Sequence, residues 1–219
     1  MGSKASGIAQ AERTATAPAV PAVLHVGSGK NFKPDWLNLD AEPAWRPDVV
    51  FDLERPWPLA GLVCDTERFG RLHLVDESFD RIVAQDVLEH IRELPTAMTS
   101  LLRLLRVGGV LAISVPYELS LGAWSDPTHV RAFNERSFEY FTNWSWYLGW
   151  ETHHFRVVRM EFVCSEFGCR LEAEGRTMDE ILRTPRAIDS MTVELVKQPL
   201  DARAREVFRH YRERSPAGG

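Results

Sequence analysis

The sequence predicts an α/β fold in which a doubly wound, mostly parallel sheet of seven strands forms a single domain. Short apolar runs that end in glycine or polar residues, and one amphipathic helix between two of them, are typical of this fold class. The chain of 219 residues is long enough to bury one large core, and no internal repeat or linker divides it.

Five apolar runs have the length and composition of buried parallel strands. Each run ends in a turn or polar residue, and the runs cover residues 23–26, 36–39, 49–51, 79–84 and 110–115. The carboxyl ends of parallel strands meet at one edge of a sheet, where ligands bind in open α/β sheets. We therefore expect the residues that follow these runs to lie close together.

Leucine and methionine residues at helical spacing predict a helix over residues 94–105, ended by the glycine pair Gly108-Gly109. Asn134 has the character of an N-cap, so we expect a second helix that begins there and carries Phe138 and Phe141.

The last two strands are expected at residues 155–163 and 192–196, as a long hairpin. We predict that residues 1–22 form a flexible N-terminal arm, that residues 23–200 form the folded domain, and that residues 201–219 form a C-terminal helix with a frayed end.

The composition indicates a soluble globular protein, with 44% hydrophobic and 26% charged residues. A net charge of −5 disfavours a nucleic-acid partner, because backbone phosphates are usually met by a basic face. Three unevenly spaced cysteines predict neither disulfides nor a zinc site. The sequence has neither an apolar leader nor a membrane span, so we expect a cytoplasmic protein with no membrane partner. A homodimer is a possible assembly.

Three successive strand ends carry a glycine turn and two acids. The turn is Gly27-Ser28-Gly29, and the acids are Asp40 and Asp52. Glycines let a backbone approach a ligand closely, and a carboxylate at the next strand end can accept hydrogen bonds from ribose hydroxyls. A third acid can accept a hydrogen bond from the amine of adenine. Each residue alone is also consistent with an ordinary turn, helix cap or solvated charge.

As an ordered set, these motifs resemble the class I S-adenosylmethionine-dependent methyltransferases, and more closely their bacterial small-molecule and glycan-type branch. The resemblance spans residues 23–116 and is carried by residues 25–29, 36–40, 52–53, 78–91 and 105–111. It implies a Rossmann-like methyltransferase fold with S-adenosylmethionine as the cofactor. Two departures are His25, where the family usually has an acid, and Phe32, where a longer motif has a third glycine.

The resemblance also implies roles for individual residues. The turn Gly27-Ser28-Gly29, preceded by His25, would line the methionine part of the cofactor. Asp40 would hold the ribose, and Asp52 with Leu53 would hold the adenine. Gln85 and Asp86 would lie near the sulfonium, where a carboxylate is electrostatically favourable. Glu89 and His90 are expected to brace the helix that follows, and direct chemistry by His90 is the alternative.

An Asp-Pro-Thr-His stretch follows the fifth strand, as in related methyltransferases close to the transferable methyl group. Asp126 could orient His129, and a neutral histidine there could take the proton released on methylation. Both residues are therefore candidate catalytic residues. The alternative is that they only anchor the loop.

Aromatic residues lie on both sides of this stretch in the sequence, and some of them are expected only to pack in the core. We expect at least one of four rings to face a flat acceptor, so the candidate substrate-binding residues are Tyr117, Trp124, Trp144 and Trp146. The adjacent pair His153-His154 lacks a third ligand at suitable spacing, so no metal site is predicted.

The predicted function is methyl transfer to an oxygen or nitrogen of a small molecule, with an aromatic or heterocyclic metabolite favoured over a sugar or glycan. A nicotinamide-dependent oxidoreductase would need a third glycine near position 32 and an acid about 20 residues further on. This sequence has Phe32 instead, and Asp40 follows Gly29 too soon, so this enzyme class is disfavoured. Nucleic-acid or protein methylation is disfavoured, because Gln85-Asp86 stands where base-methylating enzymes often carry a proline-aromatic signature. A non-catalytic protein that binds a nucleotide-like ligand or a partner is the alternative from another class.

Overall fold

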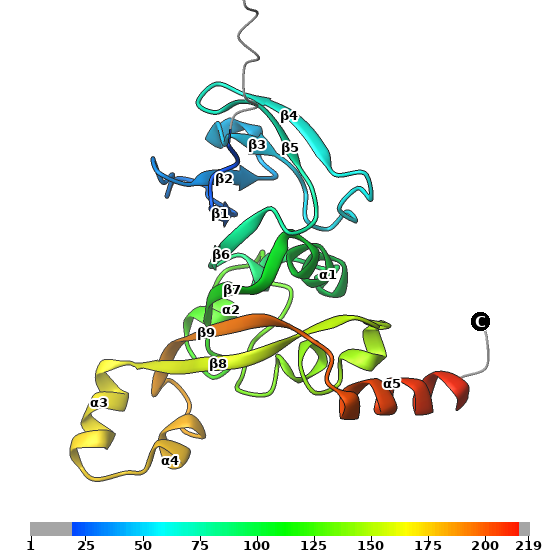
Figure 1. The fold of residues 1–219 in the computed structure, drawn as a ribbon. Coiled ribbons are helices and arrows are strands. Elements are labelled where there is room, and N and C mark those ends of the chain that lie inside the picture. The colour runs from blue at the N-terminus through cyan, green and yellow to red at the C-terminus, as the bar shows by residue number, and fades with distance from the viewer. Residues whose placement is uncertain (1–18, 215–219) are drawn as a thin grey trace, which may run out of the picture.

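A computed structural model describes residues 19–214 (Figure 1). Its main sheet has seven strands in the order β3-β2-β1-β6-β7-β9-β8. All neighbours from β3 to β7 pair in parallel, whereas β9 runs antiparallel to both β7 and β8. This confirms the predicted mostly parallel α/β fold. The strands are β1 (Val23–Val26), β2 (Leu37–Asp40), β3 (Val49–Val50), β6 (Phe79–Gln85), β7 (Leu105–Pro116), β8 (His153–Cys164) and β9 (Ile188–Pro199).

The core lies between the sheet and α1 (Leu94–Leu104), the helix predicted between the fourth and fifth strands. Its side chains Ala97, Met98 and Leu101 have no exposed surface. The helix ends one residue before the predicted boundary, because Leu105 already pairs with Phe79 in the sheet. Helical spacing thus places one apolar stripe of α1 on the strands and leaves the other side to solvent.

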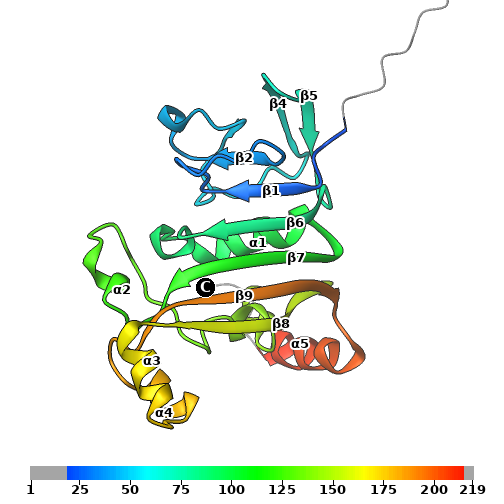
Figure 2. The ribbon, with the colours of Figure 1, turned by 90° about the vertical axis from the view of Figure 1, so that its left-hand side faces the viewer.

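The face of the sheet opposite α1 carries no helix over β6, β7 and β9 within residues 19–214, as Figures 1 and 2 show from two directions. The chain from Gly29 to the start of β2 is too short to hold a crossover helix and runs as a loop. Side chains on this face are half-exposed and partly polar, and they include an ion pair of 2.6 Å between Arg81 and Glu194. This face therefore has the alternating pattern of a sheet with one solvated side.

A two-stranded antiparallel hairpin, which the sequence did not predict, lies between β3 and β6. It consists of β4 (Leu62–Thr66) and β5 (Gly70–Leu74). The Thr66 hydroxyl donates to the carbonyl of Gly70, whose positive φ of 68° closes the turn. Leu72 and Leu74 are buried, whereas the outward residues are exposed, as expected of a hairpin packed by one face.

The segment after β7 differs from the prediction. Asn134 caps a turn by accepting a hydrogen bond from the backbone of Arg136, but no α-helix follows it. Turns and the short 3₁₀ helices η3 (Glu139–Phe141) and η4 (Ser145–Leu148) occupy this region instead. Phe138 and Phe141 are nevertheless buried. The prediction that these two residues belong to the core is therefore confirmed, whereas the predicted helix is wrong.

The last two strands pair antiparallel, as predicted, but they are longer than predicted and a helical connection replaces a simple turn. Two helices, α3 (Glu166–Ala173) and α4 (Met178–Leu182), connect β8 to β9. Ser165 and Thr177 cap these helices, and Thr177 with Glu180 forms a capping box. Polar caps, not the apolar pattern, mark these short helices in the sequence.

The remaining elements are η1 (Pro43–Trp45), η2 (Leu88–His90), α2 (Gly122–Ser125) and α5 (Ala202–Arg214). Residues 1–18 of the predicted flexible arm lie outside the described residues, as does the end of the predicted tail, so these boundaries stay a prediction. Among residues 19–214, no helix is both long enough and apolar enough to cross a lipid bilayer.

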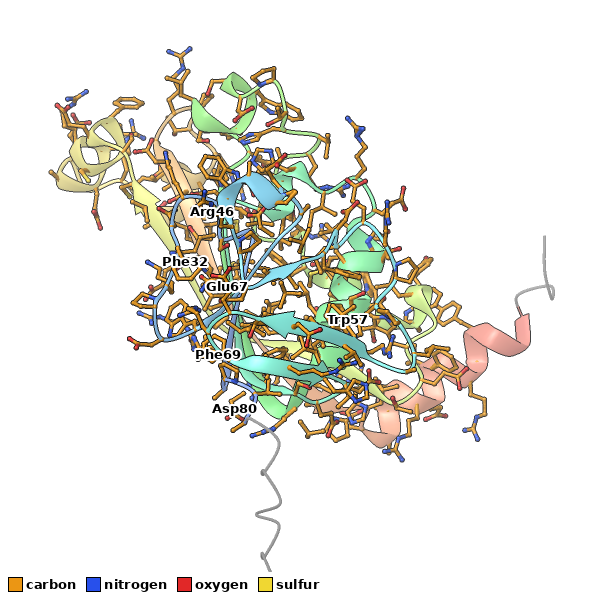
Figure 3. The ribbon with its side chains drawn as sticks, turned by 90° about the horizontal axis from the view of Figure 1, so that it is seen from above. Phe32, Arg46, Trp57, Glu67, Phe69 and Asp80 are labelled. Carbon is orange, nitrogen blue, oxygen red and sulfur yellow. The ribbon has the colours of Figure 1, made fainter. Side chains whose placement is uncertain are left out.

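A buried polar cluster holds β2 in place. The carboxylate of Asp48 accepts hydrogen bonds from the backbone and side chain of Asn38, at 2.8 and 3.1 Å, and from two guanidinium nitrogens of Arg68. The guanidinium also stacks over the rings of Phe32 and Phe69, at 4.5 Å from each centroid (both rings are labelled in Figure 3). This cluster fixes the strand that ends at Asp40.

Burial alone would raise the pKa of the Asp48 carboxyl, but the hydrogen bonds from Arg68 and Asn38 outweigh it and hold the pKa below its ordinary value. A carboxyl whose pKa is lowered on folding stabilises the folded state at a pH above its unfolded pKa of about 4. This contribution is lost as the pH falls from there through the lower pKa of the folded state.

We expect Asp48→Asn to lower the free energy of unfolding by about 2 kcal/mol at pH 7, because it removes charge-assisted hydrogen bonds at a buried site. The variant should also lose less of its stability than the wild type between about pH 5 and pH 2. Urea titrations across this range measure both effects. The control Arg71→Ala removes a 3.9 Å pair with Asp65 that is more than 70% exposed on both sides, and should cost less than about 0.5 kcal/mol. Equal losses in the two variants would contradict the role of the cluster.

Candidate functional site

The carboxyl ends of the parallel strands surround a cavity of about 330 Å³. This volume is within the range of small-ligand pockets, about 300–1,000 Å³. The neighbouring strands β3, β2, β1 and β6 of the main sheet each contribute residues at or just after their ends, and η2 contributes as well. The residues that line the cavity include Gly27, Asp40, Asp52, Leu53, Asp86 and His90.

The glycine turn and Asp40 form one unit at the mouth of this cavity. Gly27 and Gly29 have positive φ values of 60° and 43°, which favour glycine. The backbone N–H of Gly29 donates to one carboxylate oxygen of Asp40 at 2.8 Å, and the N–H of Glu42 donates to the other at 2.9 Å. Asp40 therefore holds the turn and still lines the cavity.

Asp52, Leu53 and Asp86 complete the cavity from β3 and β6. The Asp52 carboxylate accepts the N–H of Glu54 at 2.9 Å, and its side chain is 45% exposed. Leu53 is buried and supplies an apolar wall. Asp86 has a positive φ of 52°, which is uncommon for an aspartate and fits a tight turn at the end of β6.

Four predicted cofactor-binding residues do not line this cavity, and one of them, Gly29, only donates its backbone N–H to Asp40. His25 is buried, with a ring nitrogen 3.3 Å from the side-chain oxygen of Asn38, and burial lowers the pKa of His25. Ser28 is buried, and its hydroxyl has no hydrogen-bond partner within residues 19–214. Gln85 lines a different cavity, on the open face of the sheet beside Trp36. Alternation along the strands turns the side chains of His25 and Gln85 away from this cavity. Contacts of these residues with a cofactor stay predictions.

The loop that follows β7 packs against η2 beside the cavity. The N–H of Val130 donates to the carbonyl of Glu89 at 2.8 Å, and Arg131 donates to the carbonyls of Ile91 and Arg92. The rings of His90 and His129 meet edge to face with centroids 4.7 Å apart. Because His90 lines the cavity, this contact brings His129 to its rim.

Asp126 does not orient His129, contrary to the sequence-based expectation. Its carboxylate accepts hydrogen bonds from the backbone and hydroxyl of Thr128, at 2.8 and 2.6 Å, and these bonds lower the pKa of Asp126. The Thr128 oxygen lies 2.9 Å from Nδ1 of His90, whereas Nδ1 of His129 lies 2.9 Å from the carbonyl of Ala123. Asp126 thus acts on His90 through Thr128, and the backbone of α2 holds His129.

Glu89 is a site residue to which the sequence argument assigned only a bracing role. Its side chain is 1% exposed, and neither carboxylate oxygen has a hydrogen-bond partner among the described residues. Burial, together with the nearby carboxylates of Asp86 and Asp126, raises the pKa of Glu89 to about 7. Strongly perturbed acids at a cavity are candidates for function.

The predicted aromatic residues separate into different places. Tyr117 is buried, and its hydroxyl donates to Glu135 at 3.0 Å, so it serves the core. Trp124 lies on α2, next to the carbonyl of Ala123 that holds His129, and is 63% exposed. Of the four predicted rings, Trp124 alone is both exposed and near the rim of the cavity.

Trp144 and Trp146 lie at the other edge of the sheet, which corrects the prediction that they contact the acceptor. They precede β8, which runs in the same direction as β7, and therefore lie at the amino ends of the strands. There they line a cavity of about 420 Å³ between η4 and α5, where the ring of Trp146 stacks on Tyr211 at 3.8 Å. Their spacing follows from packing against the C-terminal helix.

Comparisons with known proteins concern the domain and its fold. Residues 24–113 match the profile of a methyltransferase domain. The fold is similar to a SAM-dependent methyltransferase from Archaeoglobus fulgidus, with 16% identity, a TM-score of 0.52, and coverage of 82% of this chain and 87% of that chain. It is also similar to the N-methyltransferase NodS from Bradyrhizobium japonicum in complex with S-adenosyl-L-homocysteine, with 17% identity, a TM-score of 0.47, and coverage of 83% and 80%.

A search among curated proteins found no match. The domain match shows that residues 24–113 carry a methyltransferase domain, and the fold is similar to that of a SAM-dependent methyltransferase. The predicted enzyme class and cofactor are thereby confirmed.

The residues around the cavity fit this cofactor. Asp40 and Asp52 line the cavity with carboxylates that can accept hydrogen bonds from hydroxyl and amine donors. Leu53 offers an apolar surface, and Asp86 offers negative charge to a cation. The individual contacts of these residues remain predictions.

We expect Gly27→Ala to weaken binding of S-adenosylhomocysteine at least about tenfold. A Cβ at this position would lie 2.3 Å from a methyl group of Val87, and φ is positive, so the turn beside the cavity must move. Isothermal titration calorimetry measures the affinity. Gly175→Ala is the matched control, because Gly175 has a positive φ of 83° but open space around it. Unchanged affinity in Gly27→Ala, or equal loss in both variants, would show that the turn does not shape the cofactor site.

Proposed function

We propose that this enzyme methylates an oxygen or nitrogen of a small aromatic or heterocyclic molecule at the rim between the cofactor cavity and the loop of His129. The observation that carries the proposal is the contact between the rings of His90 and His129. Because His90 lines the cavity, we place the acceptor beside these two side chains.

The negative charge of the cavity favours a small acceptor over a polyanion. Four carboxylates, those of Asp40, Asp52, Glu54 and Asp86, line the cavity. A nucleic acid would have to bring its phosphates near these groups, which is unfavourable. The net charge of −5 adds to this repulsion.

Trp124 supports a flat acceptor. Its exposed ring lies on α2, beside the residue whose carbonyl holds His129. An exposed indole offers a large apolar face on which an aromatic ring can stack, worth about 0.5–1.5 kcal/mol beyond the buried area.

Bound S-adenosylmethionine supplies an electrophilic methyl group on a sulfonium. The protein aligns the acceptor with it and excludes water, and such alignment can contribute on the order of 7 kcal/mol or more. Asp86 favours the positive charge near the reacting centre. His129 assists the loss of the proton from the acceptor, and Asp126 supports this arrangement by fixing Thr128 and His90.

A methyl-transfer assay that detects S-adenosylhomocysteine tests the acceptor class. The panel should contain phenols, N-heterocycles, free sugars, nucleotide-linked sugars, transfer RNA and unfolded protein. We expect turnover only with members of the first two groups, and a higher KM for them in Trp124→Ala than in Trp45→Ala, which removes another exposed tryptophan. Turnover confined to sugars, RNA or protein would contradict the proposal.

We expect His129→Gln to lower kcat about 10- to 100-fold near neutral pH, because the acceptor loses assistance in deprotonation. The affinity for S-adenosylhomocysteine should stay within about twofold, since His129 does not line the cofactor cavity. Steady-state kinetics and calorimetry measure the two quantities. Unchanged kcat, with retained folding, would mean that His129 only anchors the loop.

A further inference from the structure

Three hydrogen-bond acceptors face one another beside the cofactor cavity. They are the carboxylate of Glu89 and ring nitrogens of His90 and His129, and one ligand atom from each lies within 4.8 Å of the other two. Glu89 and His90 lie on η2, whereas His129 comes from the loop after β7. The hydrogen bond between Val130 and Glu89 joins the two segments.

The hydrogen bonds of His90 determine its tautomer. The Thr128 hydroxyl has one hydrogen, which it donates to Asp126 at 2.6 Å. It can therefore only accept a hydrogen bond from Nδ1 of His90, 2.9 Å away. In the neutral ring, Nε2 of His90 then carries a lone pair and no hydrogen.

The same reasoning holds for His129. Its Nδ1 lies 2.9 Å from the backbone carbonyl of Ala123, which can only accept. Nδ1 of His129 is thus the donor, and Nε2 is an unprotonated base. A carbonyl or carboxylate-linked partner on the second nitrogen is the arrangement that commonly fixes histidine ligands of metals.

Glu89 adds a buried carboxylate without a donor. Its side chain is 1% exposed, no hydrogen bond reaches either oxygen, and no ion pair with it occurs within residues 19–214. Burying an unpaired carboxylate is costly, and two lone pairs beside it increase the cost. Such a group needs either a proton or a cation.

We propose that Glu89, His90 and His129 bind one divalent transition-metal cation at the rim of the cofactor cavity. Two imidazoles and one carboxylate suit zinc, iron or manganese better than magnesium, which prefers oxygen ligands. Three protein ligands leave coordination positions for water or for an oxygen of the acceptor. Binding of the metal by itself does not depend on the proposed function.

The role of the cation does rest on the proposed function. A bound cation would lower the pKa of a coordinated acceptor hydroxyl, so that the proton leaves to water before the methyl group arrives. His129 would then assist deprotonation as a ligand and not as the base. Sequence spacing did not predict this site, because Glu89 and His129 are 40 residues apart and meet only in the fold.

Metal binding is measured first without substrate. Tag-free protein is stripped with a chelator, moved to chelator-free buffer, and titrated with Zn²⁺ by calorimetry and with Co²⁺ by visible absorption. We expect one equivalent to bind with a Kd in the micromolar range or tighter. Glu89→Gln and His129→Gln should each weaken binding at least about tenfold, with circular dichroism showing that they fold.

His73→Gln is the matched control, because His73 lies in the β4–β5 hairpin, where it contacts the carbonyl of Ala60. Its affinity for Zn²⁺ should equal that of the wild type. Absence of stoichiometric binding, or equal binding by wild type and Glu89→Gln, would overturn the proposed site and point to a protonated Glu89.

Activity separates the two proposals. If metal binds as expected but no small acceptor is turned over, the proposed acceptor class fails and the metal site stands. If small acceptors are methylated equally before and after stripping, and no metal binds, the metal site fails and the proposed function stands.

Discussion

The parallel pairing of β1 with both β2 and β6 determines where the residues of the site lie. Val26 pairs with Leu39 on one side and with Ala84 on the other. The chain positions that follow, a glycine turn, an aspartate and the end of β6, therefore emerge side by side at one edge. A shift of β2 by one residue would turn Asp40 to the other face of the sheet, so the polar cluster that holds β2 has consequences for chemistry as well as for stability.

Much of this arrangement can be predicted from the sequence, because it follows from local rules. Apolar runs with a polar end identify the central strands, and leucine spacing identifies α1. Gly27, Asp40 and Asp52 could be placed together because strand ends converge in this fold class. The neighbours of Asp126 could not be predicted, since the geometry of the loop decides whether Thr128 or His129 donates hydrogen bonds to its carboxylate.

Other parts of the site depend on contacts that are distant in the sequence. Trp144 and Trp146 have the composition of a stacking surface, yet they pack beside α5 because β8 begins just after them. Nothing local to Glu89 indicates that its carboxylate is buried without a donor. That property arises only when the loop after β7 covers η2. Long-range packing thus converts an ordinary helix-bracing motif into a candidate reaction centre.

The open face of the sheet makes this domain a two-layer structure over its central strands. Along β7, Leu111, Ile113 and Val115 point into the core, whereas Ala112 and Ser114 meet the half-exposed side. Every second position of these strands is therefore released from the volume constraints of a packed interior. Such positions tolerate a change of side-chain size without disturbing the carboxyl edge of the sheet, where the cavity lies.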